Sequence, residues 1–303
     1  MKIWVREPHA FPGPALDRLR AHGEVVLGED ADAAAADAMF VRLAHRIDRS
    51  FLESHPAIKW IVSPTTGLNH IDQVACAEFD VAILSLKGQT DFLDTIRATA
   101  EHTLALALAL LRGLPGAVGA VQAGHWDRYP HKGRELAGKS VFVWGYGRIG
   151  RQVTALYEAF GSRVVANDCV PGRVPADKFV TVSEGLEQCD LFSLHLPLEP
   201  GTEGIVDGPM LAKLPSHAVL INTARGELID QNALLAMLRE GRLAGAALDV
   251  LQDEPSPLSP AVTAALAAVP ERLIVTPHIA GYTHESLNAV ETHMVDWFLS
   301  KLG

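Results

Sequence analysis

The sequence predicts an α/β protein built from two doubly wound units, each with a parallel sheet. Three observations favour this fold class: short apolar runs alternate with helical segments, a second such series begins at Ser140, and a glycine-rich turn follows its first run. Apolar runs separated by helices are typical of parallel strands whose sheet is covered on both faces. The length of 303 residues is sufficient for two medium-sized domains.

In the first hundred residues we expect five strands and three helices. The strands are the apolar runs at 2–5, 24–27, 39–41, 59–62 and 81–84, and the helices lie at 15–22, 48–54 and 71–78. Segment 94–112 is ambiguous, because its alternating Leu and Ala residues have the period of a strand. Ala and Leu favour helices, however, and Arg112-Gly113 followed by Pro115 is a typical helix end. We therefore predict a helix that is apolar nearly all round and buried in a core or a subunit interface.

The second series contains six apolar runs and four helical segments. We expect strands at 140–144, 163–167, 191–195, 218–222, 244–250 and 273–276, and helices at 148–160, 208–214, 233–240 and 283–299. Two such series predict two doubly wound units, the second of which starts in the middle of the chain.

Composition excludes several classes of partner. The formal net charge is −10, from 26 basic and 36 acidic residues without a cluster of Lys and Arg, which argues against nucleic acid or an anionic membrane. Cys76, Cys169 and Cys189 are odd in number and far apart, so we expect neither a disulfide framework nor a metal site. No apolar run has the length of a signal peptide or a membrane span, and we expect a cytoplasmic protein.

The glycine-rich turn has the pattern of a dinucleotide-binding signature. Gly145, Gly147 and Gly150, with Arg148 and Ile149 between the last two, follow an apolar run and open an amphipathic helix. In such a turn the first glycine permits the tight bend, the second lets the backbone approach the pyrophosphate, and the third lets the helix pack close to the strand. The helix N-terminus then faces the phosphate charge, so we expect a dinucleotide to bind here.

Asp168 lies 18 residues after Gly150, at the end of the run 163–167. A carboxylate at this point accepts hydrogen bonds from the adenosine ribose hydroxyls and repels a 2′-phosphate, which favours NAD over NADP. Two alternatives stay open. Asp168 could simply cap the following turn, and the nearby Arg173 leaves some room for NADP.

Three polar residues suited to catalysis follow the ends of later apolar runs. They are Arg225, Glu254 and His278. Because ligands of a doubly wound sheet bind at the carboxyl ends of its strands, we expect these three side chains to converge. Each of them alone would more often be a structural or solvated residue, but together, beyond a nucleotide signature, they indicate a catalytic site. An arginine can bind the carboxylate of an acidic substrate, and an imidazole beside a carboxylate can donate or accept a proton.

The late motifs also carry a family resemblance. NTARGELID at 222–230, ALDV at 247–250 with the acidic DEP after it, and TPHIAGYT at 276–283 resemble the D-isomer-specific 2-hydroxyacid dehydrogenases. That family includes glyoxylate/hydroxypyruvate reductases and phosphoglycerate dehydrogenases. The resemblance implies a Rossmann NAD-binding domain at 99–282, inserted into a flavodoxin-like substrate domain made of 1–98 and 283–303. It also implies a homodimer formed through the 94–126 region.

The resemblance assigns roles to particular residues. Arg225, Glu254 and His278 match the family's catalytic arginine, glutamate and histidine, and Asp249 matches the aspartate that holds the nicotinamide carboxamide. Thr223 completes the residues that we expect to contact the cofactor. The implied reaction is the NAD-dependent interconversion of a small D-2-hydroxy acid and its 2-oxo acid, in which His278 and Glu254 handle the proton and Arg225 anchors the substrate.

The chain departs from the family's pattern in two loops. It has Thr65-Thr66-Gly67 where the family usually has Gly-x-Gly, and we expect the backbone N–H groups of Thr66 and Gly67 to hold the substrate carboxylate. The stretch 85–102 is longer than the family's and carries Lys87, which either contacts a distal anionic group of the substrate or is a solvated loop residue.

Three other functions remain to be compared with this one. A formate dehydrogenase would typically carry glutamine where Glu254 stands, which argues against that activity. Phosphite oxidation is not excluded by these three residues. A non-catalytic protein that senses NAD(H) is the third alternative, since some co-repressors of this fold keep the catalytic positions.

Overall fold

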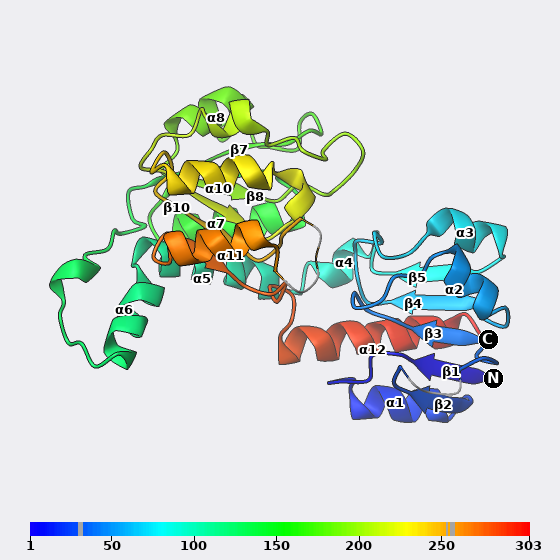
Figure 1. Cartoon of the computed structure of the whole chain (residues 1–303). Coiled ribbons are helices and arrows are strands. Elements are labelled where there is room, and N and C mark those ends of the chain that lie inside the picture. The colour runs from blue at the N-terminus through cyan, green and yellow to red at the C-terminus, as the bar shows by residue number, and fades with distance from the viewer. Residues whose placement is uncertain (30–32, 253, 255–257) are drawn as a thin grey trace. The chain divides into compact units, whose positions relative to one another are not determined.

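The chain forms two compact units. The computed structural model describes residues 1–29, 33–252, 254 and 258–303. Unit 1 contains residues 1–96 and 282–303, and unit 2 contains residues 97–281. Each unit has one parallel sheet with helices on both faces (Figure 1), which confirms the predicted fold class.

Unit 1 has a five-stranded parallel sheet in the order β2-β1-β3-β4-β5, which is the flavodoxin-like order. Its strands are β1 (Lys2–Val5), β2 (Glu24–Leu27), β3 (Ala38–Phe40), β4 (Trp60–Ser63) and β5 (Ala82–Ser85). One face packs against α1 (Gly13–Arg20), α4 (Thr90–Leu93) and α12 (His284–Ser300), and the other against α2 (Arg49–Ser54) and α3 (Gln73–Glu78). The last helix of the chain therefore completes the unit that the first strand begins.

Unit 2 has a six-stranded parallel sheet in the order β11-β10-β9-β8-β6-β7. Its strands are β6 (Ser140–Trp144), β7 (Arg163–Asn167), β8 (Leu191–Leu194), β9 (Val219–Asn222), β10 (Gly245–Leu248) and β11 (Leu273–Val275). A further parallel bridge joins Ala166 of β7 to Phe179. If Phe179 is counted as a reduced strand, the order up to β10 is the 3-2-1-4-5-6 of a Rossmann fold, and β11 extends the sheet by one strand. The chain reverses its direction of strand addition between β6 and β8.

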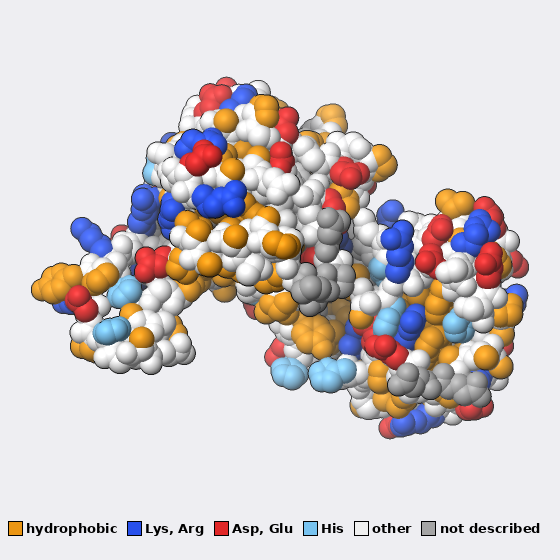
Figure 2. Space-filling view, in the orientation of Figure 1, with side chains coloured by type: hydrophobic (Ala, Val, Ile, Leu, Met, Phe, Trp, Pro, Cys, Tyr) orange, Lys and Arg blue, Asp and Glu red, His pale blue; other side chains and the backbone are white. Residues whose placement is uncertain are grey.

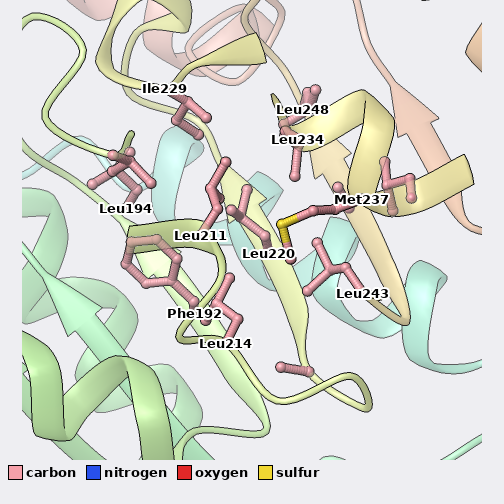
Figure 3. Close-up of a cluster of buried hydrophobic side chains, with 14 of the residues drawn as sticks. Phe192, Leu194, Leu211, Leu214, Leu220, Ile229, Leu234, Met237, Leu243 and Leu248 are labelled. Carbon is pink, nitrogen blue, oxygen red and sulfur yellow. The ribbon is translucent and has the colours of Figure 1, made fainter. Parts of the chain in front are cut away.

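Two hydrophobic cores support the unit 2 sheet. α5 (Ala98–Leu111) and α7 (Arg148–Ala159) cover one face. α8 (Val182–Gln188), α9 (Gly208–Leu211), α10 (Gln231–Arg239) and α11 (Pro260–Ala268) cover the other. Figure 3 shows this second core, in which Phe192 and Leu220 from the strands meet Leu211 and Met237 from the helices. Full burial of such a side chain contributes about 1.5–3 kcal/mol to the stability of the folded state. The strand ends are therefore held in place by a tightly packed core.

Most predicted elements are present with ends shifted by a few residues, but four helices were not predicted. They are α4, α6 (Leu114–Gln122), α8 and α11. For α8 a signal was available, since Thr181 and Glu184 form a capping box at its start. α6 buries none of its residues, and Leu114, Val118 and Val121 are about half exposed. It stands away from the body of unit 2 in Figure 1.

No single helix in the described ranges is long and apolar enough to cross a membrane. α5 and α6 together pass the length and composition test, but they are bent by 66° at the break between them.

Candidate active site

The glycine turn lies at the point where the unit 2 sheet changes direction, between β6 and β8. Gly145 has φ +100°, and a Cβ on it would lie 2.5 Å from the carbonyl group of His195, the residue after β8. A Cβ on Gly150 would lie 1.9 Å from the carbonyl oxygen of Gly145. Nothing lies within 4 Å of a Cβ at Gly147. The first and third glycines are therefore required by packing, and the second leaves open space above the backbone.

This turn fits a dinucleotide pyrophosphate. Gly147 caps α7 without a side-chain acceptor, and this 12-residue helix begins beside the open space at that glycine. Arg148 and Ile149 are the first residues of α7, as the motif requires. A helix N-terminus without a side-chain cap attracts a phosphate group.

Asp168 follows β7 and its carboxylate is already in contact with the glycine turn. Oδ2 accepts a hydrogen bond from the Tyr146 N–H at 2.7 Å, and Oδ1 accepts one from the Val170 N–H at 2.8 Å. Arg173 Nη1 forms an ion pair with Oδ1 at 3.1 Å. The side chain is only 2% exposed, so the charge is held at a fixed place beside the turn.

The three predicted catalytic residues lie at the carboxyl-end edge of the same sheet. Arg225 follows β9, Glu254 follows β10, and His278 follows β11. Since these three strands are adjacent and parallel, their carboxyl ends open on one side of the sheet. The glycine turn after β6 opens on that side as well, which brings the nucleotide and acid–base motifs to one edge.

Glu254 and His278 form a direct pair. His278 Nδ1 lies 2.6 Å from Glu254 Oε2, while Glu254 Oε1 accepts a hydrogen bond from the Leu251 N–H at 2.9 Å. Both carboxylate oxygens are thus engaged, and the imidazole keeps its Nε2 for another partner. The backbone of His278 has φ +51°, a left-handed conformation that is uncommon for a non-glycine residue. Such strain is retained where the surrounding structure fixes it, and it occurs often at functional sites.

Hydrogen bonds fix both the backbone and the side chain of Arg225. Asn222 Nδ2 donates to the Arg225 carbonyl oxygen at 2.8 Å, and the Arg225 Nη1 donates to the carbonyl oxygen of Ala224 at 2.6 Å. The next residue, Gly226, has no room for a side chain, because a Cβ would lie 2.0 Å from the carbonyl carbon of Leu251. Burial lowers the pKa of the Arg225 guanidinium, and the negative charges of Glu227 and Glu254 oppose that effect. The guanidinium is therefore a partly desolvated cation near the acid–base pair.

Asp249 follows β10, and its carboxylate is hydrogen-bonded to the turn after β11 that carries His278. Its carboxylate is buried, with Oδ1 accepting hydrogen bonds from the Thr276 hydroxyl at 2.5 Å and the Ile279 N–H at 2.9 Å. Oδ2 accepts a hydrogen bond from the Ala280 N–H at 2.8 Å. Burial favours the neutral form, but the hydrogen bonds from His102, Thr276 and the two backbone N–H groups outweigh it, so the pKa of Asp249 is lowered. Asp249 therefore remains ionised and holds this turn together.

Two residues of this network were not predicted from the sequence. His102 lies on α5, and its Nε2 is 3.2 Å from the hydroxyl of Thr276. Thr276 is two residues before His278 and could have been suspected as part of the TPH motif. His102 lies 174 residues from Thr276 along the chain, and no local sequence pattern relates the two.

The remaining predicted residues lie in two places. Thr223 is at the end of β9, and its hydroxyl lies 2.8 Å from that of Thr103 on α5. Thr66 and Gly67 lie in unit 1, in the loop after β4, where the Thr65 hydroxyl donates to the Gly67 carbonyl oxygen at 2.8 Å. Within the described part of the chain, neither the Thr66 nor the Gly67 N–H has a hydrogen-bond acceptor.

A Rossmann unit with a glycine turn at its switch point, and a carboxylate–imidazole pair with an arginine on the same edge, defines an oxidoreductase that uses a nicotinamide dinucleotide. Residues 104–280 match the family profile described as D-isomer specific 2-hydroxyacid dehydrogenase, NAD binding domain. This match covers more than half of the 303 residues, and the chain belongs to that family. It is thus an oxidoreductase that acts on the CH–OH group of small hydroxy acids or on the matching oxo acids.

Individual relatives agree with this membership. The chain is 37% identical over 281 residues to the (S)-sulfolactate dehydrogenase of Chromohalobacter salexigens, covering 90% of this chain and 87% of that protein. It is 33% identical over 262 residues to the D-3-phosphoglycerate dehydrogenase of Methanocaldococcus jannaschii, covering 85% of this chain but only 48% of that protein. The crystal structure of the TT0316 protein from Thermus thermophilus superposes with a TM-score of 0.86 at 31% identity, covering 100% of this chain and 97% of that one.

Proposed function

We propose that this protein interconverts a small D-2-hydroxy acid and its 2-oxo acid with NAD(H) as the cofactor. The observation that supports this most directly is the 2.6 Å contact between Glu254 and His278 on the sheet edge that also carries the glycine turn. Reduction of a 2-oxo acid requires a hydride at carbon and a proton at oxygen, and the edge that carries the candidate dinucleotide site also carries a proton donor.

Each of the three catalytic residues has a distinct role. His278, protonated, donates a proton to the carbonyl oxygen, and in the oxidation direction it removes the proton from the hydroxyl. Glu254 orients the imidazole through Nδ1, so that Nε2 faces the substrate. Arg225 pairs with the substrate carboxylate and polarises the carbonyl bond.

The bound nicotinamide supplies or accepts the hydride. We assign the pyrophosphate to the turn at Gly145, Gly147 and Gly150 with Arg148 and Ile149. Asp249 Oδ2 accepts a hydrogen bond from the Ala280 N–H, and a carboxylate oxygen has a second acceptor site for the carboxamide N–H. Thr223 lies at the end of β9, beside the turn that bears Arg225, and we include it among the cofactor contacts.

NAD is favoured over NADP because of Asp168. We assign this carboxylate, which is fixed beside the glycine turn, to the ribose hydroxyls, whereas a 2′-phosphate would meet a negative charge. Arg173 is already paired with this carboxylate, so it is not an independent phosphate site.

The substrate carboxylate also has a binding loop in unit 1. We assign this role to the N–H groups of Thr66 and Gly67, whose loop is shaped by the hydrogen bond from the Thr65 hydroxyl to the Gly67 carbonyl oxygen. Lys87 is exposed and follows β5, and we treat it as a candidate for a distal anionic group of the substrate.

The protein is also proposed to be a homodimer through the 94–126 region. α6 buries no residue, and the segment after it exposes Trp126 at 92%. Figure 2 shows orange apolar side chains gathered at the tip of the projecting segment of unit 2. Apolar surface of this kind on a projecting element fits a contact with a second copy of the chain.

Turnover with a panel of acids tests the proposed function. Purified protein is assayed with NADH or NAD⁺ and with glyoxylate, hydroxypyruvate, sulfolactate, 3-phosphoglycerate and phosphite. Oxidation or reduction of the cofactor with a 2-oxo or 2-hydroxy acid is expected. Turnover with phosphite alone would replace this function by phosphite oxidation. Tight NADH binding without turnover on any of these compounds would instead indicate a sensing protein.

The variant His278→Ala then tests the mechanism. We expect it to lose turnover by about a hundredfold or more, because a general acid usually contributes about 10²–10⁴-fold, while it binds NADH with unchanged affinity. A matched control is His284→Ala, which changes a histidine at the start of α12. Full activity of His278→Ala would remove this residue from the mechanism.

A further inference from the structure

α5 contacts two of the catalytic strand ends through neighbouring side chains. His102 Nε2 lies 3.2 Å from the Thr276 hydroxyl and 3.4 Å from Asp249 Oδ1. The next residue, Thr103, lies 2.8 Å from the hydroxyl of Thr223 through its own hydroxyl. His102 thus contacts Asp249 after β10 and Thr276 after β11. Thr103 contacts Thr223, the residue after β9.

The His102 contact acts on the turn that carries His278. Asp249 Oδ1 accepts hydrogen bonds from Thr276 and the Ile279 N–H, and Oδ2 accepts one from the Ala280 N–H. These donors all belong to the catalytic turn itself. Within the residues that the structure describes, His102 is the one partner of the Asp249 carboxylate that comes from a separate helix. The turn also holds His278 at φ +51°, which would relax to an ordinary conformation if the network were loosened.

The Thr103 contact acts on the loop that carries Arg225. The Thr103 hydroxyl donates to the Thr99 carbonyl oxygen at 2.7 Å, so the Thr223 hydroxyl has to be the donor in the contact between the two threonines. Thr103 is 0% exposed and Thr223 is 7% exposed, so water does not compete with this bond. Thr223 is two residues before Arg225, in the segment that Asn222 closes with its own side chain.

α5 is suited to act as a rigid support for both the turn that carries His278 and the loop that carries Arg225. It packs so closely on β10 that a Cβ at Gly245 would lie 2.9 Å from the Leu110 side chain. Leu106, Ala107 and Leu110 are buried in the core that α5 shares with α7 and the sheet. A displacement of α5 is therefore opposed along much of its length.

We propose that His102 and Thr103 are positioning residues, which hold the His278 turn and the Arg225 loop at a fixed spacing on one rigid helix. Neither residue is assigned a contact with substrate or cofactor. The expected kinetic effect rests on the proposed function, but the positioning itself does not.

Amide hydrogen exchange tests the positioning without any need for turnover. We expect His102→Leu to accelerate exchange at the amides of Ile279 and Ala280 about fivefold, as for the loss of one hydrogen bond. His102→Gln keeps an N–H donor and should restore slow exchange. Thr103→Val should accelerate exchange at Ala224 only, and Thr103→Ser should not. Glu101→Gln, an exposed residue on the same helix, is the control and should change neither region.

Steady-state kinetics on the same variants separate the two contacts. His102→Leu should lower kcat about tenfold with KM for the 2-oxo acid within about threefold, because it loosens the proton donor. Thr103→Val should instead raise that KM, because it loosens the residue that binds the carboxylate. A purely structural role would lower the melting temperature in both variants without this split and without rescue by Gln or Ser.

The outcomes separate this inference from the proposed function. Exchange that is unchanged in the two variants, or accelerated uniformly over unit 2, overturns the positioning role. If the wild-type protein turns over no 2-oxo acid but the exchange changes are local and rescued, the proposed function fails and the positioning role stands.

Discussion

Replacement of Gly226 by alanine should disable the catalytic edge although Gly226 itself carries no functional group. An added Cβ would lie 2.0 Å from the carbonyl carbon of Leu251 and 2.1 Å from its oxygen. Ordinary contact begins at 3.4 Å, so the two backbone segments must separate by about 1.4 Å (3.4 − 2.0). One of these segments carries Arg225, and the other, through the Leu251 N–H, is bonded to Glu254. The separation therefore moves Arg225, the proposed substrate anchor, away from Glu254 and His278.

The size of the effect follows from this displacement. A misplacement of about 1 Å costs roughly a hundredfold in rate, so we expect kcat/KM for the 2-oxo acid to fall at least that much. Overpacking costs about 1–3 kcal/mol, which corresponds to a drop in melting temperature of roughly 2–12 °C for a unit of this size. NADH affinity should change little, because the glycine turn after β6 is untouched.

A matched variant controls for the effect of adding a methyl group to a glycine. Gly201→Ala places a Cβ where nothing lies within 4 Å, and it should keep the activity and melting temperature of the wild-type protein. The assay is the initial rate of NADH oxidation, with the melting temperature measured by differential scanning calorimetry. A Gly226→Ala protein that retains a third of the wild-type rate at an unchanged melting temperature would refute the reasoning.

Three further predictions concern other parts of the chain. Asp168→Ala should raise the ratio of kcat/KM with NADPH to kcat/KM with NADH by about tenfold or more, because removal of about 1.4 kcal/mol of charge repulsion gives that factor. An unchanged ratio would place the ribose contact elsewhere. Burial lowers the pKa of His195 to about 3, so the unfolded chain takes up a proton below about pH 6.5 while the native chain does not. Urea unfolding should therefore show about 2 kcal/mol less stability at pH 5 than at pH 7, and His195→Gln should remove most of this loss. Val118→Glu with Val121→Glu should convert the proposed dimer to a monomer in light scattering. A mass equal to that of the wild-type protein would argue against α6 as the contact.

Much of the fold could be predicted because buried parallel strands leave a simple signal. Runs such as 140–144 and 218–222 are apolar throughout most of their length, since both faces of the sheet are covered, and the structure has strands at both. α6 gives no such signal: it buries no residue, so no periodic pattern marks it. The reduced strand at Phe179 was also missed, because a single bridge needs no apolar run.

For the candidate site, the sequence identified groups but not their supports. Arg225, Glu254 and His278 could be proposed because each follows an apolar run, and strand ends of a doubly wound sheet share one edge. The left-handed backbone of His278 was not predictable, since histidine has no special preference for positive φ comparable to that of glycine. The contacts of His102 and Thr103 join residues 174 and 120 positions apart, and only the packing of α5 on the sheet creates them.

The position of Asp249 explains how the strained turn at the candidate site stays intact around neutral pH. Hydrogen bonds hold the pKa of this buried carboxylate below its ordinary value, so its stabilising contribution is present above the unfolded value of about 3.9 and is lost only as the pH falls through the lower folded value. Near neutral pH Asp249 therefore stays ionised and continues to accept the Ile279 and Ala280 N–H groups. A change of pH near neutrality does not release the turn that carries His278.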